Sequence, residues 1–391
     1  MPVKTDVAVA VDIRRSWGRR LKILHTADVH LGARFSVLGP EKGNAQRLQL
    51  QRTFERIGEL AVAERVDLFV VAGDLFDSNR PSASSVDVVR RVFGRLVEAD
   101  IRVFAIPGTH DCFDSSSVWR TIEMPAGVTV FTDRSEPAMV PELDLAVHGL
   151  VFASKKAPAG ALLSLARCEG AALHVGIAHG SVAIPGILED DSVLFTAEEV
   201  AGTGMDYLAL GHWHSFKQER FGDVTACYPG SPEFVSIDQK GAGQVALVEI
   251  DRDGTLRVEP RTVGVRRFES LEISVDALGS SSQVVDAIRA RADADLVLDV
   301  TLAGLCPFDF ECDIDEIAAQ TQDGFFHLRL RDKTHPRLDD VAMAELAETS
   351  VAGRFARVMR AHIEDAAADD KGVFEDGLRL GVALLEGRQV L

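Results

Sequence analysis

The 391-residue chain has few cysteines and no long apolar run, and both absences narrow the classes of protein to which it can belong. Its five cysteines form no C-x-x-C pair and no disulfide pattern, which is typical of a chain kept in a reducing cytoplasm. No stretch approaches the roughly 18 consecutive apolar residues of a transmembrane helix, so we expect no membrane partner. The basic residues near the amino terminus follow a short apolar run, an order that argues against a secretory signal.

Basic residues are also scarce relative to acidic ones. There are 42 Lys and Arg against 60 Asp and Glu, for a net charge of −18. A chain of this charge does not bind nucleic acid over its whole surface, which leaves room only for a local basic groove. The hydrophobic fraction of 46% and the length predict a globular protein of two or three domains.

Short apolar runs alternate with longer amphipathic segments up to about residue 250. Five runs have the composition of buried strands, and each ends at Gly, His, Asp or Ala: 21–27, 66–73, 101–108, 173–180 and 205–212. Apolar residues at helical spacing predict helices over 45–66 and 84–99. This alternation predicts an α/β fold.

Four segments follow from changes in pattern along the chain. We expect a flexible extension over 1–20, a large α/β domain over 21–265, a small α/β unit over 266–335 and a helical segment over 336–391. In the last segment an apolar stripe repeats at helical spacing, through Val351, Phe355, Val358, Met359 and Ile363. The stripe predicts packing either on the chain's own second unit or on a partner helix.

Asp and His side chains gather where the predicted strands end. In chain order these are Asp28 and His30; Asp74 and Asp77; Thr109, His110 and Asp111; His179; and His212 and His214. Ligands bind at the carboxyl ends of strands in α/β sheets, so we expect these side chains to meet. Carboxylate and imidazole suit Mn, Fe or Zn, and a bridging Asp suits two ions. Each His alone could be a structural imidazole, but five motifs in order argue against that reading.

The ordered motifs D-x-H, GD-x-x-D, G-x-H-D, H and GH-x-H resemble those of the calcineurin-like metallophosphoesterases. HTADVHLG at 25–32, RVDLFVVAGDLFD at 65–77, and MDYLALGHWH at 205–214 followed by YPGSPE are similar to the SbcD-type DNA repair exonucleases, and within them to the YhaO-like branch. The resemblance implies a metallophosphoesterase β-sandwich with flanking helices as the catalytic domain over 21–265. It further implies a small α/β capping domain over 266–335 and a helical C-terminal tail over 336–391.

The resemblance implies two divalent metal ions, with Mn favoured and Fe or Zn as alternatives. One ion would be bound by Asp28, His30, Asp74 and His214. Asp74 would bridge to the other ion, whose ligands would be completed by His179, His212 and Thr109.

His110 would lie beside the scissile phosphate, as an acid for the leaving group or as a charge stabiliser. The resemblance makes Asp77 the residue that orients His110. Asp111 is the other candidate, and it could instead cap the following turn. Thr109 stands where the family has Asn, and its hydroxyl reaches about one bond less far than an amide oxygen. We therefore expect a water in the gap or a weakly held second metal.

The resemblance implies a dinuclear metal-dependent DNA nuclease, an exonuclease by family, acting in cytoplasmic DNA repair. Its partners would be DNA and an SMC/SbcC-like (YhaN-like) ATPase, and a homodimer is left open. Two alternatives stay open: a small-molecule phosphodiesterase or phosphatase, and a weakly active or non-catalytic scaffold subunit because of Thr109. Ser78 follows Asp77 where protein phosphatases have Arg, which disfavours a protein phosphatase.

Overall fold

The computed structural model describes residues 20–385 except 133–135, 185, 187, 189–190, 237–240, 252, 277, 279, 307–312, 337–348 and 368–369. The expected extension over 1–20 therefore lies outside the described residues except for Arg20, and part of the 336–391 segment does too. The chain divides into two compact units between Arg267 and Phe268. Each unit is described by itself.

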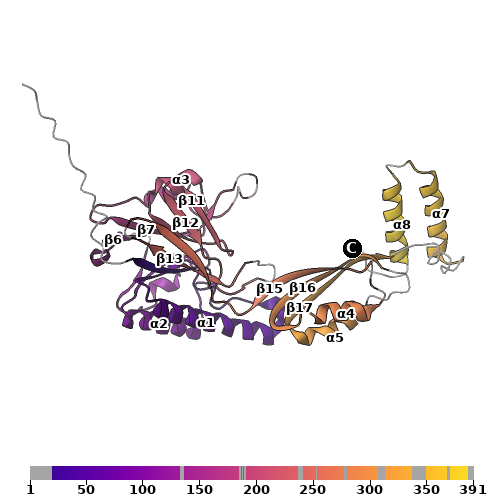
Figure 1. Cartoon of the computed structure of the whole chain (residues 1–391), viewed down its shortest axis with the longest axis horizontal. Coiled ribbons are helices and arrows are strands. Elements are labelled where there is room, and N and C mark those ends of the chain that lie inside the picture. Colours follow the sequence, from indigo (N-terminus) through magenta and orange to yellow (C-terminus); the bar gives the residue numbers. More distant parts are fainter. Residues whose placement is uncertain are drawn as a thin grey trace, which may run out of the picture. The chain divides into compact units, whose positions relative to one another are not determined.

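The first unit is built on two six-stranded sheets (Figure 1). The first sheet has the order β14-β13-β1-β2-β3-β4, with β14 Leu256–Thr262, β13 Gln244–Ile250, β1 Leu21–Thr26, β2 Leu68–Ala72, β3 Arg102–Ile106 and β4 Val128–Val130. The second has the order β11-β12-β10-β7-β6-β5, with β11 Lys217–Phe221, β12 Val224–Tyr228, β10 Tyr207–Gly211, β7 Leu173–His179, β6 Leu145–Gly149 and β5 Ala138–Val140. A short pair, β8 Ser181–Val182 and β9 Leu194–Phe195, lies beside them.

Parallel pairing sets where the site will form. Strands β1, β2, β3 and β4 pair in parallel, and so do β6, β7, β10 and β12. The two sheets pack face to face through β2, β3, β7 and β10. The carboxyl ends of the central strands of both sheets therefore reach the same edge.

Helices cover the outer faces of both sheets. On the first sheet, α1 (Gly39–Glu64) and α2 (Ala83–Glu98) lie side by side (Figure 1). Phe54 of α1, Phe69 of β2 and Phe93 of α2 join the three elements, with ring centroids 6.1–6.4 Å apart. On the second sheet, α3 (Ala197–Gly202) contributes Val200 to a core with Leu208 and Ala226. The β-sandwich with flanking helices expected from the resemblance is confirmed.

Short 3-10 helices connect several of these elements. They are η2 Ser36–Leu38, η3 Val118–Arg120, η4 Pro141–Leu143 and η5 Ala161–Ser164 in the first unit, and η6 Gln322–Gly324 in the second.

The second unit begins with a three-stranded sheet, β15-β16-β17. Its strands are β15 Arg267–Ser274, β16 Asp293–Cys306 and β17 Phe325–Pro336, and its helices are α4 Ser281–Arg289 and α5 Ile314–Thr321. Both helices pack their apolar side on the sheet, through residues such as Val284, Ile288 and Ile317. The small α/β unit is present as expected, and its role as a cap remains a prediction.

The unit ends with two helices, α7 (Val351–Asp365) and α8 (Lys371–Leu385), which pack against each other. Val351 and Val358 are 70% and 56% exposed. The buried side instead contains Ala352 and Ala356, with Phe355, Met359 and Ile363 partly buried beside them. The reason is close packing, since small residues on α7 let α8 approach. Three residues of the stripe therefore pack within the unit, whereas Val351 and Val358 remain exposed.

Within the described residues, no helix combines the length and apolar character needed to cross a bilayer.

Lowering the pH is expected to destabilise the fold through His25, a fully buried residue of β1 whose Nδ1 lies 2.9 Å from the Tyr207 hydroxyl. Burial lowers the pKa of His25 from 6.5 to about 3. The folded protein keeps the ring neutral, whereas the unfolded chain takes up a proton below pH 6.5. The free energy of unfolding should therefore fall as the pH drops from about 6.5 toward 3.

Urea unfolding across this pH range would test this, with His25→Gln as the comparison. The variant should be less stable at neutral pH. The number of protons taken up on unfolding, which sets the slope of its unfolding free energy against pH, should be smaller by close to one. Equal slopes for the two proteins would contradict the assignment.

Candidate metal centre

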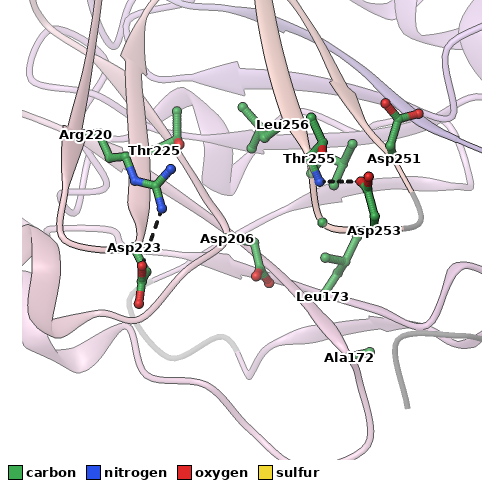
Figure 2. A pocket seen from close by; sticks show the side chains of 12 residues that line it. Ala172, Leu173, Asp206, Arg220, Asp223, Thr225, Asp251, Asp253, Thr255 and Leu256 are labelled. Carbon is green, nitrogen blue, oxygen red and sulfur yellow. Dashed lines mark hydrogen bonds and ion pairs between the residues drawn. The ribbon is translucent and has the colours of Figure 1, made fainter. Parts of the chain in front are cut away.

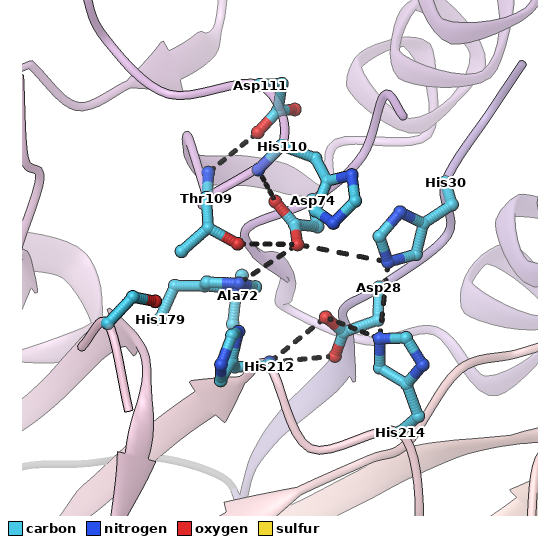
Figure 3. A network of polar contacts seen from close by, with 12 residues as sticks. Asp28, His30, Ala72, Asp74, Thr109, His110, Asp111, His179, His212 and His214 are labelled. Carbon is cyan, nitrogen blue, oxygen red and sulfur yellow. Dashed lines mark hydrogen bonds and ion pairs between the residues drawn. The ribbon is translucent and has the colours of Figure 1, made fainter. Parts of the chain in front are cut away.

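The carboxyl ends of five strands meet at one edge of the sandwich and bring the predicted side chains together (Figure 3). Three groups of side chains have ligand atoms that all lie within 4.8 Å of one another: Asp28, His30 and His214; His30, Asp74 and His110; and Asp74, His179 and His212. His30 and Asp74 each belong to two of the groups. The three groups are therefore parts of one continuous cluster.

The backbone is bent sharply at four of these residues. Asp28, His30, Asp74 and His212 have φ values of +53°, +49°, +51° and +97°. Left-handed backbone is uncommon for residues other than Gly, and it persists where the surroundings enforce it. Here Asp28 N–H donates to the Gly73 carbonyl at 3.2 Å, and His30 N–H donates to the Asp74 carbonyl at 3.0 Å. These bonds hold the turns after β1 and β2 against each other.

Gly211 is required by the close approach of the two sheets. A Cβ at Gly211 would collide with the carbonyl of Ala72 and the ring of His179. The G of the GH-x-H motif therefore allows β10 to end directly against β2, which places His212 beside Asp74.

Asp28, His30 and His214 form one side of the cluster. The Nε2 atoms of His30 and His214 face each other at 3.3 Å, and His214 Nε2 lies 3.7 Å from Asp28 Oδ1. Burial lowers the pKa of His214. Burial also acts to lower the pKa of His30, but the carboxylates of Asp77, Asp74 and Asp28 outweigh it and raise that pKa.

Asp74 is fully enclosed at the middle of the cluster. Its Oδ1 accepts the backbone N–H of His110 at 2.7 Å, and its Oδ2 lies 3.1 Å from His179 Nε2 and 3.9 Å from His30 Nε2. Burial acts to raise the pKa of Asp74, but the positive charges of His179, His30 and His110 hold it well below its usual range. The carboxylate is thus kept ionised and surrounded by imidazoles.

His179 is oriented as a metal-binding imidazole. Its Nδ1 must carry a proton, because it donates to the Ala72 carbonyl at 2.8 Å. Its buried Nε2 lies beside Asp74 but makes no hydrogen bond of normal geometry. Burial acts to lower the pKa of His179, but the charge of Asp74 outweighs it and raises that pKa.

The structure distinguishes between Asp77 and Asp111 as the neighbour of His110. His110 is half exposed, and its Nδ1 lies 3.2 Å from the Asp77 carbonyl oxygen and 3.7 Å from Asp77 Oδ1. Asp111 is buried and faces away: its carboxylate accepts the backbone N–H groups of Gly108 and Phe76 at 2.7 and 3.1 Å. Burial, followed by the charge of Asp74, raises the pKa of Asp111 to about 6. Asp111 thus accepts N–H groups from the turn that precedes it and from the turn after β2, and not from the following turn that its alternative role named.

Thr109 lies beside Asp74. It is 9% exposed, and its hydroxyl donates to Asp74 Oδ2 at 3.3 Å. The hydroxyl therefore faces the same carboxylate oxygen as His179.

The donor set of the cluster fits two divalent cations. It offers imidazole nitrogens and carboxylate oxygens, a shared central carboxylate, and a buried imidazole nitrogen that lacks a hydrogen bond. The side chains could therefore hold divalent ions of the kind that imidazole and carboxylate ligands bind, such as Mn, Fe or Zn.

The sequence profile of the calcineurin-like phosphoesterases matches residues 21–216, just over half of the chain. The chain belongs to this family of hydrolases. The matched region contains both ends of the cluster, from Asp28 to His214, so the resemblance inferred from the motifs is confirmed.

Among curated relatives of this phosphoesterase, the uncharacterized metallophosphoesterase YhaO of Bacillus subtilis is 29% identical over 244 residues, covering 59% of this chain and 57% of YhaO. The DNA double-strand break repair protein Mre11 of Methanopyrus kandleri is 28% identical, covering 70% of this chain and 69% of Mre11. Mre11 of Methanosarcina mazei is 28% identical, with 66% and 40% covered. The match thus spans only about half the length of YhaO and less of the Methanosarcina protein.

Asp191 joins the phosphoesterase cluster although the motifs do not include it. Its Oδ2 lies 3.1 Å from His212 Nε2 and accepts the Ser181 hydroxyl at 2.6 Å. Burial acts to raise the pKa of Asp191, but Ser181, His212 and Ser192 together lower it. A carboxylate on one ring nitrogen fixes the tautomer and the orientation of the ring. We infer that Asp191 positions His212 for metal binding through its other nitrogen.

Asp191→Asn is expected to weaken metal binding by about 10- to 100-fold, because it removes the charge that orients His212. Isothermal titration calorimetry of metal-free protein with Mn²⁺ measures this change in affinity. Asp223→Asn is a matched control, since Asp223 is fully exposed. Equal metal affinity in both variants would show that Asp191 has no part in the centre.

A separate pocket of about 560 Å³ opens at the amino ends of β7 and β10 (Figure 2). Four carboxylates line it, from Asp206, Asp223, Asp251 and Asp253, together with Arg220. Such a lining repels a phosphodiester, so this pocket does not fit the substrates of a phosphoesterase.

Proposed function

We propose that this phosphoesterase is a dinuclear metal-dependent DNA nuclease that acts in DNA repair, with Mn²⁺ as the favoured metal. The observation that carries the proposal is the continuous Asp–His cluster around Asp74, with half-exposed His110 at its border. The similarity to proteins named DNA double-strand break repair protein Mre11 supports DNA as the substrate. Exonuclease action is the part of the proposal that rests on the SbcD-type motifs alone.

We propose Asp28, His30, Asp74 and His214 as ligands of one ion, and Asp74, His179, His212 and Thr109 as ligands of the other. Two such ions would bind a phosphodiester oxygen and lower the pKa of a bound water. Other residues of the chain hold His110 in place as the proton donor. Asp77 holds His110 through Nδ1, which leaves Nε2 to donate a proton to the leaving oxygen. Asp111 keeps the turn at Gly108 closed, so that His110 stays over the cluster.

Thr109→Asn is expected to tighten binding of the more weakly held ion by up to about tenfold. The amide oxygen of Asn reaches further than the hydroxyl, which now donates to Asp74 at 3.3 Å. The Mn²⁺ concentration that gives half-maximal hydrolysis should fall accordingly, whereas Thr121→Asn, at an exposed threonine, should leave it unchanged. Two equally tight sites in the wild-type protein would contradict this explanation.

We also propose that an SMC/SbcC-like (YhaN-like) ATPase binds the α7–α8 pair. Exposed apolar side chains on these helices support it, with Val351, Val358, Val373, Leu384 and Leu385 each at least 46% exposed. A basic DNA path supplied by the ATPase would account for how a chain of charge −18 meets a polyanion.

The test of the function is hydrolysis of linear duplex DNA by the purified chain with Mn²⁺. Mg²⁺ alone and a chromogenic phosphodiester are run in parallel. Degradation of DNA supports the nuclease. Cleavage of the chromogenic diester alone would indicate a small-molecule phosphodiesterase or a missing partner. If neither is cleaved at millimolar Mn²⁺, the proposed activity is wrong and Thr109 favours a scaffold subunit.

A further inference from the structure

A second group of metal-binding side chains lies in the first unit, away from the phosphoesterase centre. In the described part of the chain, four groups of His, Cys, Asp and Glu have converging ligand atoms, and three of them belong to the centre around Asp74. The fourth consists of His148, Cys168 and His174, with ligand atoms within 4.8 Å of one another. We propose that these three residues bind a zinc ion.

The fold places the two histidines on neighbouring strands. His148 lies on β6 and His174 at the start of β7, and the strands pair in parallel with His148 opposite Gly176. His174 is five residues before His179 on the same strand, so the two lie roughly 16 Å apart at about 3.3 Å per residue. The proposed ion would therefore be separate from the catalytic pair.

The histidine pair has the geometry of two ligands of one ion. His148 Nε2 and His174 Nδ1 are 3.0 Å apart. A tetrahedral zinc about 2.0–2.1 Å from each of two nitrogens holds them roughly 3.3 Å apart, so a shift of a few tenths of an ångström would suffice. Both rings are almost completely buried, at 4% and 1% exposure.

A hydrogen bond on the other side of the His174 ring decides which of its nitrogens can bind a metal ion. Its Nε2 lies 3.1 Å from the Ala171 carbonyl oxygen, which only accepts, so Nε2 carries the proton. Nδ1 of His174 then has a free lone pair on the side of the ring that faces His148 Nε2. A backbone carbonyl on the second nitrogen is the usual partner of a metal-binding histidine.

Cys168 completes the set from the segment that precedes β7. Its thiol is free and its side chain is half-buried, so an ion can reach the site from solvent. Imidazole and thiolate are both zinc ligands, and three protein ligands leave a fourth position for water. Binding would release the thiol proton and tie β6, β7 and the segment between them together.

The alternative is a neutral pair in which His148 Nε2–H donates to His174 Nδ1. That arrangement explains the 3.0 Å distance but gives Cys168 no role. The two possibilities differ in whether the thiol takes part, and cobalt reports on this directly. Thiolate bound to Co²⁺ gives a charge-transfer absorption that imidazole and carboxylate ligands do not.

The first experiment is titration of the metal-free full-length protein with Co²⁺. We expect a thiolate-to-cobalt band in the wild type, its loss in Cys168→Ala and its retention in Cys227→Ala, where Cys227 is a buried cysteine of β12. The Asp74 cluster contains no thiol, so the band is independent of the phosphoesterase centre and of its activity. No band in the wild type, or a band that survives in Cys168→Ala, would overturn the proposal.

A second experiment needs no variant and covers the case in which Cys168→Ala fails to fold. Iodoacetamide labelling of Cys168 in the wild type, mapped by mass spectrometry, should slow at least tenfold when Zn²⁺ is added. Mn²⁺, which binds thiolate poorly, should not give this protection. Equal labelling rates with and without Zn²⁺ would show that the site is only a hydrogen-bonded histidine pair.

Discussion

His110→Ala is expected to lower the rate of phosphodiester hydrolysis by about 10²- to 10⁴-fold while both metal ions still bind. His110 is half exposed, and Asp77 occupies its Nδ1, so its other nitrogen is available to a substrate. Loss of a positioned proton donor slows bond cleavage without changing the ligands of the ions. The measurements are turnover with Mn²⁺ at saturating metal, and the number of ions bound per chain.

The structure makes this experiment decisive, because His110 also lies within ligand distance of His30 and Asp74. If His110 is a ligand, His110→Ala will bind one ion fewer and will recover activity at higher Mn²⁺. If it is the acid, no metal concentration restores the rate. His335→Ala, at an exposed histidine of β17, is the matched control and should change neither quantity. An unchanged rate in His110→Ala would point to a scaffold.

Most of the central fold could be predicted because buried parallel strands leave a strong signal. Apolar runs such as 66–73 end at Gly73 and Asp74, and the structure ends β2 at Ala72. The shared edge then follows from parallel pairing, since it brings all carboxyl ends together. Local sequence was sufficient here because the same residues that end the strands form the cluster.

Contacts between distant segments could not be predicted in this way. Asp191 reaches His212 from a loop after β8, and no spacing relates the two residues. His148 and Cys168 meet His174 only because β6 pairs with β7. Val351 and Val358 continue the helical repeat of α7, yet the contact with α8 runs through Ala352 and Ala356. In each case the neighbouring segment in the fold, and not the local sequence pattern, decides which side chains make the contact.

Asp74→Asn is expected to abolish tight binding of both ions and to reduce hydrolysis by at least about 10⁴-fold. Asp74 Oδ2 faces His179 on one side and His30 on the other, so this carboxylate is placed to serve both sites. An amide is a neutral and weaker ligand, and it cannot offset the charge of two cations. Equilibrium dialysis with Mn²⁺ would measure the ions bound, and DNA or chromogenic diester hydrolysis the activity.

Asp111→Asn is the sharpest comparison, because Asp111 is an equally buried carboxylate of the same turn but is not among the proposed ligands. Its two oxygens accept backbone N–H groups of Gly108 and Phe76, so an amide there loses one acceptor and should cost about 1–3 kcal/mol of folding free energy. It should still bind two ions. The pair therefore separates damage to the fold from loss of the metals. Two ions bound to Asp74→Asn with normal affinity would mean that Asp74 is not shared between the sites, and that the other proposed ligands set the occupancy of each.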